Sequence, residues 1–392
     1  MKKRVFLLIS FVVSTLLIMG QNQDFEQLIK NIKKEFASDG RVELFDIEGT
    51  QQNNSLILTG KTTSKLAYNK LISEIQKRGI DVKDKILLLP DKALGDEIWG
   101  IAYNSVGTIR SDKKYSSELV SQILMGTPVR ILEKEGEWRR VQTPDKYIGW
   151  INGSIQPISK SALQHYLKQP QIIVTAFNAK AYSKSDVNSS PISDLVAGDM
   201  LVVKNETPDF FHVVYPDKRK AYISKNDAKS LNTWLNDIQL TGESLVHTAK
   251  QFMGIPYLWG GTSTKGVDCS GFTKTVYFLH GIILARDASQ QVRYGKLIDE
   301  KGDFENALPG DLVFFGEKDK ENNGRERVVH VGIYIGNKRF IHASDYVRIS
   351  SFDANDALYD EYNTNRYLRT KRIIGEVNNK GIDEILNNEF YQ

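Results

Sequence analysis

Asp268-Cys269-Ser270-Gly271-Phe272 opens an expected helix and contains the only cysteine among the 392 residues. The helical pattern runs from Cys269 to His280 and ends at Gly281. A cysteine at a helix start meets free amide N–H groups and the positive end of the helix dipole, which lower the pKa of its thiol. The small residues that follow keep the thiol accessible. The pattern therefore favours a nucleophile over a buried, inert cysteine.

Two histidines on an expected strand hairpin supply a candidate base. In the run Val328–Ile335, His330 and Gly332 lie on the same face, because side chains alternate along a strand. A turn at Gly336-Asn337 brings the chain back, so that His342 falls opposite Gly332 and diagonal to His330. Diagonal neighbours lie roughly 7–8 Å apart at the backbone, within side-chain reach. We expect one histidine to take the thiol proton and the second to orient the first.

Other interpretations of these three residues stay open. A lone cysteine can be structural, and two histidines at a hairpin can be incidental. A zinc site is the rival chemistry, because one cysteine and two histidines are legitimate ligands. The chain contains neither HExxH nor CxxC, and we expect no metal or cofactor. The combination with the glycine-containing approach loop, Tyr257 to Val267, favours catalysis.

The N-terminus carries an export pattern. Basic residues at positions 2–4 precede an apolar run from Val5 to Met19, which is short for a membrane span. We expect residues 1–22 to be a signal peptide, with an uncleaved anchor as the alternative. The mature protein would then be exported, periplasmic or extracellular, without stable membrane insertion. Without the three basic residues the formal charge falls from +4 to +1, so nucleic acid is not an expected partner.

Residues 23–92 indicate a small α+β domain of order αββαβ. Its helical patterns and strand-like runs lie at 24–39, Val42–Ile47, Ser55–Gly60, 64–78 and Val82–Leu89. The run contains no cluster of chemically reactive side chains. A spacer, a folding aid and a partner surface are all open as its role.

Residues 96–228 contain an internal duplication with an offset of 72 positions. Pro144-Asp145-Lys146 recurs as Pro216-Asp217-Lys218, and other glycine and aromatic positions match in the same register. Short strand-like runs broken by Gly, Pro and Asp predict two small all-β barrels, at 96–158 and 166–230. Ser117–Gln122 has no counterpart in the second copy, and the copies differ around Tyr147. The first copy is therefore the better candidate for ligand binding.

Residues 240–376 return to an α+β pattern, and five blocks in them resemble the NlpC/P60 cell-wall cysteine peptidases. The blocks are Pro256–Gly261, Asp268–Phe272, Pro309–Phe315, His330–Gly336 and Phe340–Ala343. The resemblance implies a papain-like α+β core with Cys269 as nucleophile, His330 as general base and His342 as orienting residue. It also implies that Tyr257 lies near the oxyanion, beside the backbone N–H of Cys269. The duplicated copies resemble bacterial SH3-like (SH3b) domains.

The arrangement of two SH3b copies ahead of an NlpC/P60-like domain is similar to that of the γ-D-glutamyl-L-diamino-acid endopeptidases, also called dipeptidyl-peptidase VI. That group cleaves after L-Ala-γ-D-Glu in peptidoglycan-derived peptides with a free N-terminal alanine. The resemblance implies an ammonium site that includes Glu118, Tyr147 and Asp287, and a contact from Arg286 or Ser289 to the α-carboxylate of D-Glu. Ala288 stands where a serine is expected. The substrate-binding residues so implied are Glu118, Tyr147, Asp268, Ser270, Arg286, Asp287 and Ser289.

The expected activity is hydrolysis of the bond between γ-D-Glu and the diamino acid, with release of L-Ala-γ-D-Glu. The alternative is a D,L-endopeptidase that trims intact peptidoglycan, with the SH3b copies as wall-binding modules. A non-enzymatic reading is a binding module with a decayed site. The sequence leaves open the choice of Lys or diaminopimelate and the oligomeric state. Residues 377–392 are polar and are expected to form a loose tail.

Overall fold

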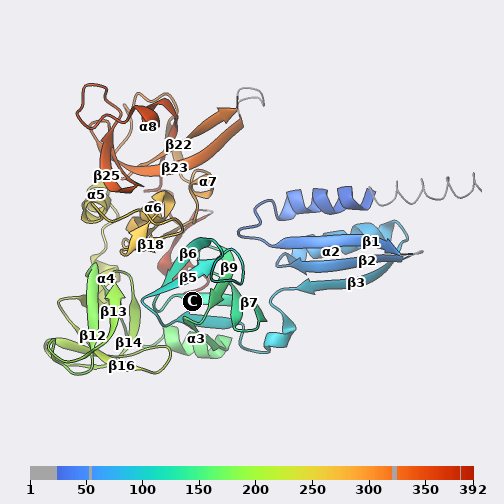
Figure 1. Ribbon diagram of the computed structural model, residues 1–392, viewed down its shortest axis with the longest axis horizontal. Helices are drawn as coiled ribbons and strands as arrows, with labels where there is room; N and C mark the ends of the chain where they lie inside the picture. The colour runs from blue at the N-terminus through green and yellow to red at the C-terminus, as the bar shows by residue number, and fades with distance from the viewer. Residues whose placement is uncertain (1–23, 53–54, 320–324, 380) are drawn as a thin grey trace, which may run out of the picture. The chain divides into compact units, whose positions relative to one another are not determined.

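The computed structural model describes residues 24–52, 55–319, 325–379 and 381–392 (Figure 1). It divides into two units, of which the first ends at Gly95 and the second runs from Asp96 to Gln392. The predicted signal peptide, residues 1–22, lies outside the described residues.

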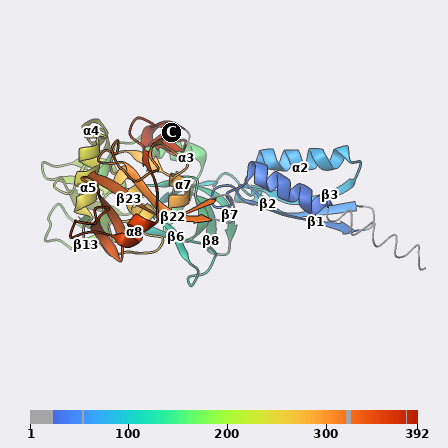
Figure 2. The ribbon, with the colours of Figure 1, turned by 90° about the horizontal axis from the view of Figure 1, so that it is seen from above.

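The first unit is a three-stranded sheet with two helices on one face. After the helical residues 24–36 its elements are β1 (Phe45–Gln52), β2 (Ser55–Thr62), α2 (Lys65–Lys77), β3 (Asp81–Leu88) and the 3-10 turn η1 (Lys92–Leu94). β1 and β2 pair antiparallel, and β2 and β3 pair parallel. Leu56 and Leu58 of β2 share one buried cluster with Leu71 of α2 and Ile32 of the first helix. Figure 2 shows both helices over the same face of the sheet. The predicted order αββαβ is confirmed.

The second unit begins with two antiparallel seven-stranded sheets. The first contains β4 (Trp99–Ala102), β5 (Val106–Arg110), β6 (Leu119–Leu124), β7 (Pro128–Glu135), β8 (Trp138–Gln142), β9 (Ile148–Asn152) and β10 (Ile155–Ile158). The second contains β11 (Gln171–Val174), β12 (Asn178–Tyr182), β13 (Pro191–Val196), β14 (Met200–Glu206), β15 (Phe210–Val214), β16 (Lys220–Ser224) and β17 (Ala228–Ser230). Helix α3 (Lys160–Leu167) joins them, and α4 (Leu231–Asp237) follows.

These two sheets confirm the internal duplication. The first six strands of one copy begin 72 residues before their counterparts in the other, as Trp99 and Gln171 illustrate. The strand order is β10-β4-β7-β8-β9-β5-β6 in the first copy, and β13-β12-β16-β15-β14-β11-β17 is the same order read backwards. Even the turn after the repeated Pro-Asp recurs, because Lys146 and Lys218 both take a positive φ, 68° and 73°. The repeated turn residues therefore encode the same fold twice.

The C-terminal part is an α+β core built on a six-stranded antiparallel sheet. Its helices are α5 (Gly242–Gln251), α6 (Cys269–Phe278), α7 (Ala288–Gln291) and α8 (Glu361–Asn365), with a 3-10 turn η2 (Ile385–Asn387). The sheet contains, in spatial order, β21 (Lys296–Asp299), β26 (Tyr367–Arg372), β22 (Leu312–Asp319), β23 (Arg325–Gly336), β24 (Arg339–Ser344) and β25 (Tyr346–Ser351). Two short pairs complete it: β18 (Thr262–Ser263) with β19 (Gly266–Val267), and β20 (Ile282–Leu284) with β27 (Ile382–Glu384).

Helix α6 is the centre of this core. Phe272, Val276 and Tyr277 are completely buried, and they pack with Val331 and Ile341 of the sheet. The helix therefore carries Cys269 on a rigid element rather than on a loop. The predicted α+β class is confirmed, with α6 ending near the expected glycine.

The prediction of a loose C-terminal tail is wrong. Strand β27 pairs with β20, and Phe390 is 1% exposed with its ring against Trp99 of β4, 5.4 Å between centroids. The Asn388 side-chain amide donates to the carbonyl of Pro144 at 3.1 Å. A few apolar residues in a polar stretch were enough to bury the tail against the first copy, since each large side chain contributes independently of the average composition.

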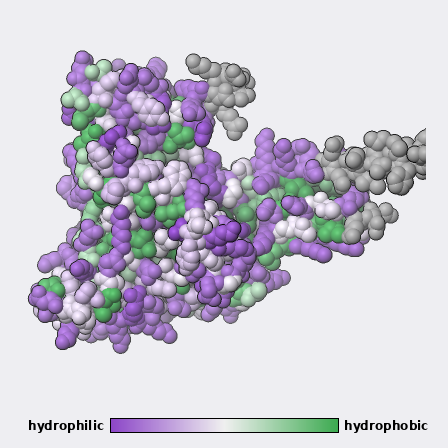
Figure 3. Space-filling view, in the orientation of Figure 1, coloured by the Kyte–Doolittle hydropathy of each residue, from purple (hydrophilic) through white to green (hydrophobic). Residues whose placement is uncertain are grey.

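Within the described ranges, the structure has no helix that is both long enough and apolar enough to cross a membrane. On the face shown in Figure 3, hydrophilic side chains cover most of the second copy, with hydrophobic residues in small patches.

Candidate functional site

The cysteine lies at the first residue of α6, where its neighbours fix the helix start. Asp268 is the N-cap residue, and its Oδ1 accepts the Gly271 N–H at 2.7 Å. A Cβ on Gly271 would lie 1.9 Å from the carbonyl oxygen of Gly261, so only glycine lets the approach loop come this close to the helix. Cys269 is 8% exposed, at the edge of the core cluster.

The two histidines meet on the sheet as the sequence predicts. The pairs Ile333–Ile341 and Tyr334–Phe340 set the register that places His342 opposite Gly332. His330 Nε2 and His342 Nδ1 are 2.7 Å apart. One detail of the hairpin differs: Gly336 pairs with Arg339, so the two turn residues are Asn337 and Lys338 rather than Gly336-Asn337, and a bulge lies between Tyr334 and Gly336. The bulge absorbs the extra residue and preserves the shared face.

Behind His342 lie two polar side chains that the sequence analysis missed. His342 Nε2 is 3.0 Å from Ser350 Oγ and 3.9 Å from Asp360 Oδ2. If neutral His330 is to accept a proton on Nδ1, its own proton stands on Nε2 and is donated to His342. His342 then donates from Nε2 to Ser350. The alternation of β25 marks Ser350 as a possible partner, but no sequence signal marks Asp360, which follows in a loop.

The resting protonation state of the Cys269 thiol differs from the one that the sequence predicts. Burial, followed by the nearby Asp268 carboxylate, raises the pKa of Cys269 to about 12, although the amides of Val331 and Ser270 act to lower it. Burial, with the adjacent His342, holds the pKa of His330 well below 6.5. The expected lowering of the thiol pKa is therefore wrong, because loss of solvent outweighs the amides at the helix start. At rest Cys269 is therefore a neutral thiol and His330 a neutral imidazole.

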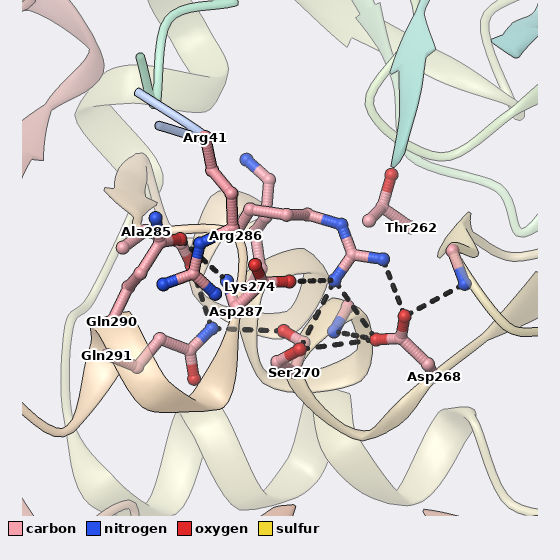
Figure 4. A network of polar contacts seen from close by, with 12 residues as sticks. Arg41, Thr262, Asp268, Ser270, Lys274, Ala285, Arg286, Asp287, Gln290 and Gln291 are labelled. Carbon is pink, nitrogen blue, oxygen red and sulfur yellow. Dashed lines mark hydrogen bonds and ion pairs between the residues drawn. The ribbon is translucent and has the colours of Figure 1, made fainter. Parts of the chain in front are cut away.

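Arg286 joins the cysteine helix to the segment before α7 (Figure 4). Its Nη1 and Nη2 donate to Asp268 at 3.1 and 2.5 Å, and Nη1 also donates to Ser270 Oγ at 3.2 Å. Arg286 is 1% exposed, and Asp268 and Ser270 are also buried. The guanidinium is thus engaged with the helix start through both Nη atoms, and its contact to a substrate carboxylate stays a prediction. The structure assigns these three residues to holding Cys269 in place.

Tyr257 lies on the approach loop near the cysteine. Burial, and then the charges of Cys269 and Asp268, raise its pKa above that of an ordinary tyrosine. Tyr257 and His330 line one cleft of about 520 Å³. Its N–H donates to the carbonyl of Asp345 at 2.8 Å, which ties the loop to the turn between β24 and β25. A role at the oxyanion remains a prediction.

The first copy docks directly on the approach loop and on α6. Trp259 Nε1 donates to Glu118 Oε1 at 2.7 Å, and the Thr262 N–H donates to Gln122 Oε1 at 2.8 Å. Asp145, from the repeated Pro-Asp-Lys, forms an ion pair with Lys274 of α6 at 3.0 Å. Strand β6 has the counterpart β13 in the second copy, so the expectation that the second copy lacks this segment is wrong. The second copy also contacts the approach loop, because the Phe177 carbonyl accepts from Thr264 Oγ1 at 2.7 Å and Asp194 pairs with Lys265.

The remaining predicted residues lie around the same helix start. Tyr147 is buried, and its charge would act on Arg286. Asp287 Oδ1 is 3.9 Å from Arg286 Nη1, and Ser289 lies half-buried on α7. Ala288 is 6% exposed, so the position where a serine was expected is filled by an apolar contact. The structure thus gathers residues from the first copy, α6 and α7 on one side of Cys269.

Metal coordination has no support in the geometry. Throughout the ranges that the structure describes, no three or more His, Cys, Asp and Glu side chains are grouped so as to hold a metal ion.

Comparisons with known proteins agree with this arrangement. Residues 254–372 match the model of the NlpC/P60 family, and residues 109–154 match the bacterial dipeptidyl-peptidase Sh3 domain. A γ-D-glutamyl-L-lysine dipeptidyl-peptidase of Bacillus cereus is 32% identical over 237 residues, 58% of this chain and 68% of the relative. Dipeptidyl-peptidase 6 of Lysinibacillus sphaericus is 28% identical over 260 residues, 62% of this chain and 88% of the relative. A crystal structure of an NlpC/P60 family protein from Bacillus cereus matches with a TM-score of 0.59 and 25% identity, over 70% of this chain and 99% of that one.

Proposed function

The chain belongs to the NlpC/P60 family of cysteine peptidases, and we propose that it hydrolyses the γ-D-Glu–diamino acid bond of peptidoglycan-derived peptides with a free N-terminal L-Ala. The product would be L-Ala-γ-D-Glu. The observation that carries the proposal is the docking of Glu118 from the first copy onto Trp259 of the approach loop. The names of the γ-D-glutamyl-L-lysine dipeptidyl-peptidases among the relatives support the same bond.

The chemistry follows from the resting protonation states. Cys269 Sγ attacks the γ-carbonyl carbon while its proton passes to His330, and the carbonyl oxygen becomes an oxyanion near the Cys269 N–H and Tyr257. His330 then gives that proton to the nitrogen of the diamino acid, the C–N bond breaks and a thioester remains. Water, deprotonated by His330, attacks the thioester and releases the dipeptide and the thiol. His342 keeps His330 in the productive tautomer throughout.

Selection for a free amine follows from charge. Within the described residues, Trp259 is the one hydrogen-bond partner of the Glu118 side chain and contacts Oε1, so Oε2 remains for a substrate ammonium. Asp287, whose Oδ1 is 3.9 Å from Arg286 Nη1, supplies a second carboxylate. An N-acetylated peptide brings no ammonium to Glu118, so it loses a charge-assisted hydrogen bond worth about 1.5–3 kcal/mol.

The test compares L-Ala-γ-D-Glu-L-Lys with its N-acetylated form. Release of L-Ala-γ-D-Glu from the free peptide alone is expected, and equal cleavage of both would remove the free-amine requirement. Glu118→Gln should raise KM for the free peptide with little change in kcat, whereas Cys269→Ala should abolish turnover. Purified sacculi form the third arm, and cleavage of sacculi without cleavage of the soluble peptides would favour the D,L-endopeptidase.

Export is part of the proposal. Residues 1–22 would direct the chain out of the cytoplasm, supported by the basic start and apolar run of the sequence. Cell fractionation with and without residues 1–22 tests this, and an unchanged distribution would contradict it.

A further inference from the structure

A cleft opens beside the catalytic base, and none of Glu118, Gln122 and Asp145 of the first copy lines it. Within the described part of the chain it is lined by Tyr257, His330, Ala343, Ser344, Asp345 and Arg366, and has a volume of about 520 Å³. Its walls come from the turn after β24 and the residue that follows α8. None of the residues assigned to the amine side, Glu118, Tyr147 and Asp287, lines it.

Arg366 gives this cleft a positive charge that is held in place. Its Nε and Nη2 donate to Asn363 Oδ1 at 3.0 and 2.8 Å, and its guanidinium lies over the Tyr362 ring at 4.2 Å. Among the described residues no Asp or Glu forms an ion pair with Arg366. Asp345, the carboxylate that lines the cleft, is paired with Arg348 at 3.7 Å. A half-buried guanidinium without an anionic partner is suited to bind one.

The order of bond breaking says which part of the substrate enters this cleft. His330 returns the proton to the departing nitrogen, so that nitrogen must lie against the imidazole. The acyl half, L-Ala-γ-D-Glu, extends from Cys269 towards Glu118 and Asp287. The diamino acid therefore extends the other way, into the cleft that His330 and Arg366 share.

We propose that Arg366 binds a carboxylate of the leaving diamino acid. It thereby selects peptides in which the diamino acid is the last residue or carries a second carboxylate. The inference rests on the proposed function. The shared chemistry is a carboxylate, and its source is either the free α-carboxylate of a C-terminal diamino acid or the side-chain carboxylate of diaminopimelate.

Three peptides distinguish the sources: L-Ala-γ-D-Glu-L-Lys, the same peptide as the C-terminal amide, and L-Ala-γ-D-Glu-diaminopimelate with only its α-carboxylate amidated. The wild-type protein should cleave the first peptide about 10-fold or more faster than the Lys amide in kcat/KM, as expected for a hydrogen bond to a charged group. The third peptide reports whether the side-chain carboxylate substitutes for the α-carboxylate. Arg366→Gln, which retains a donor for Asn363, should make the kcat/KM values of the three peptides similar. Arg366→Lys should retain part of the preference for the free acid over the amide.

Arg348→Gln is the matched control. Arg348 also faces both histidines and lowers their pKa, but it does not line the cleft. If Arg366 binds the carboxylate, only its variant changes the acid-to-amide ratio. Equal cleavage of all three peptides by the wild-type protein, or the same ratio change in both variants, would overturn the inference and leave the proposed function standing. No cleavage of any peptide would overturn both.

Discussion

Replacing Arg286 with methionine should strongly destabilise the second unit, because it strands a buried carboxylate. Arg286 is 1% exposed and makes two hydrogen bonds to Asp268, which is itself 7% exposed. Methionine fills a similar volume, so the main loss is electrostatic. Asp268 would keep the amides of Gly271 and Gly260 but no cation. Breaking a buried ion pair from one side costs about 3–5 kcal/mol.

Thermal unfolding followed by circular dichroism measures this change. A loss of that size should lower Tm by roughly 6–15 °C in a unit of this length. The double variant Arg286→Met/Asp268→Asn should recover part of the loss, because a neutral amide oxygen still caps the helix. As a control, Lys229→Met removes an exposed ion pair between Lys229 and Asp237, which lie 3.0 Å apart. This change should lower the free energy of unfolding by less than about 1 kcal/mol.

The reasoning would be refuted by an Arg286→Met protein that melts within a degree or two of the wild type. It would also be refuted if the added Asp268→Asn change lowered Tm further, since the remaining carboxylate would then not be the source of the instability. Peptidase activity of Arg286→Met should fall as well, because the cation that lowers the pKa of Cys269 is gone.

Three further outcomes are expected. Burial keeps the pKa of His330 well below 6.5 and that of His342 at about 4, so the base stays neutral as the pH falls. We therefore expect kcat/KM to decline in acid only below the ordinary histidine range, and a decline with its midpoint at pH 6.5 would contradict this. Phe390→Ala should cost about 3–5 kcal/mol in urea unfolding and raise KM for the free-amine peptide, because the tail fastens the first copy; unchanged stability would show that the tail is loose. Ser350→Ala removes the acceptor at His342 and should lower kcat about tenfold with little change in KM, and an equal rise in KM would point to a structural defect instead.

The cysteine, the two histidines and the duplication were predictable because each depends on short-range rules. A helix start depends on a cap and a glycine, a shared face on period-two alternation, and the duplicated sheets on turn residues 72 positions apart. Each helix or strand signal lies within a few neighbouring residues, and the duplication repeats such a set, so all of them can be recognised without knowledge of the tertiary contacts. The bulge near Gly336 altered the turn but not the face.

The pKa of Cys269, the engagement of Arg286 and the burial of the tail were not predictable in the same way. Each depends on what other segments bring to the same place: the sheet that covers the thiol, the Asp268 carboxylate across the helix start, and Trp99 beneath Phe390. Desolvation and ion pairing are set by such long-range contacts, and a sequence window contains no record of them.

The sequence by itself therefore determined the elements on which the cysteine and the two histidines lie, since helix caps, strand alternation and turns are local. Only the tertiary structure decided how Cys269 is charged and which side chains of the first copy contact the approach loop. Those properties come from Glu118, Asp268 and Arg286, which belong to different segments of the chain and reach their partners only after folding, because desolvation and ion pairing depend on such contacts.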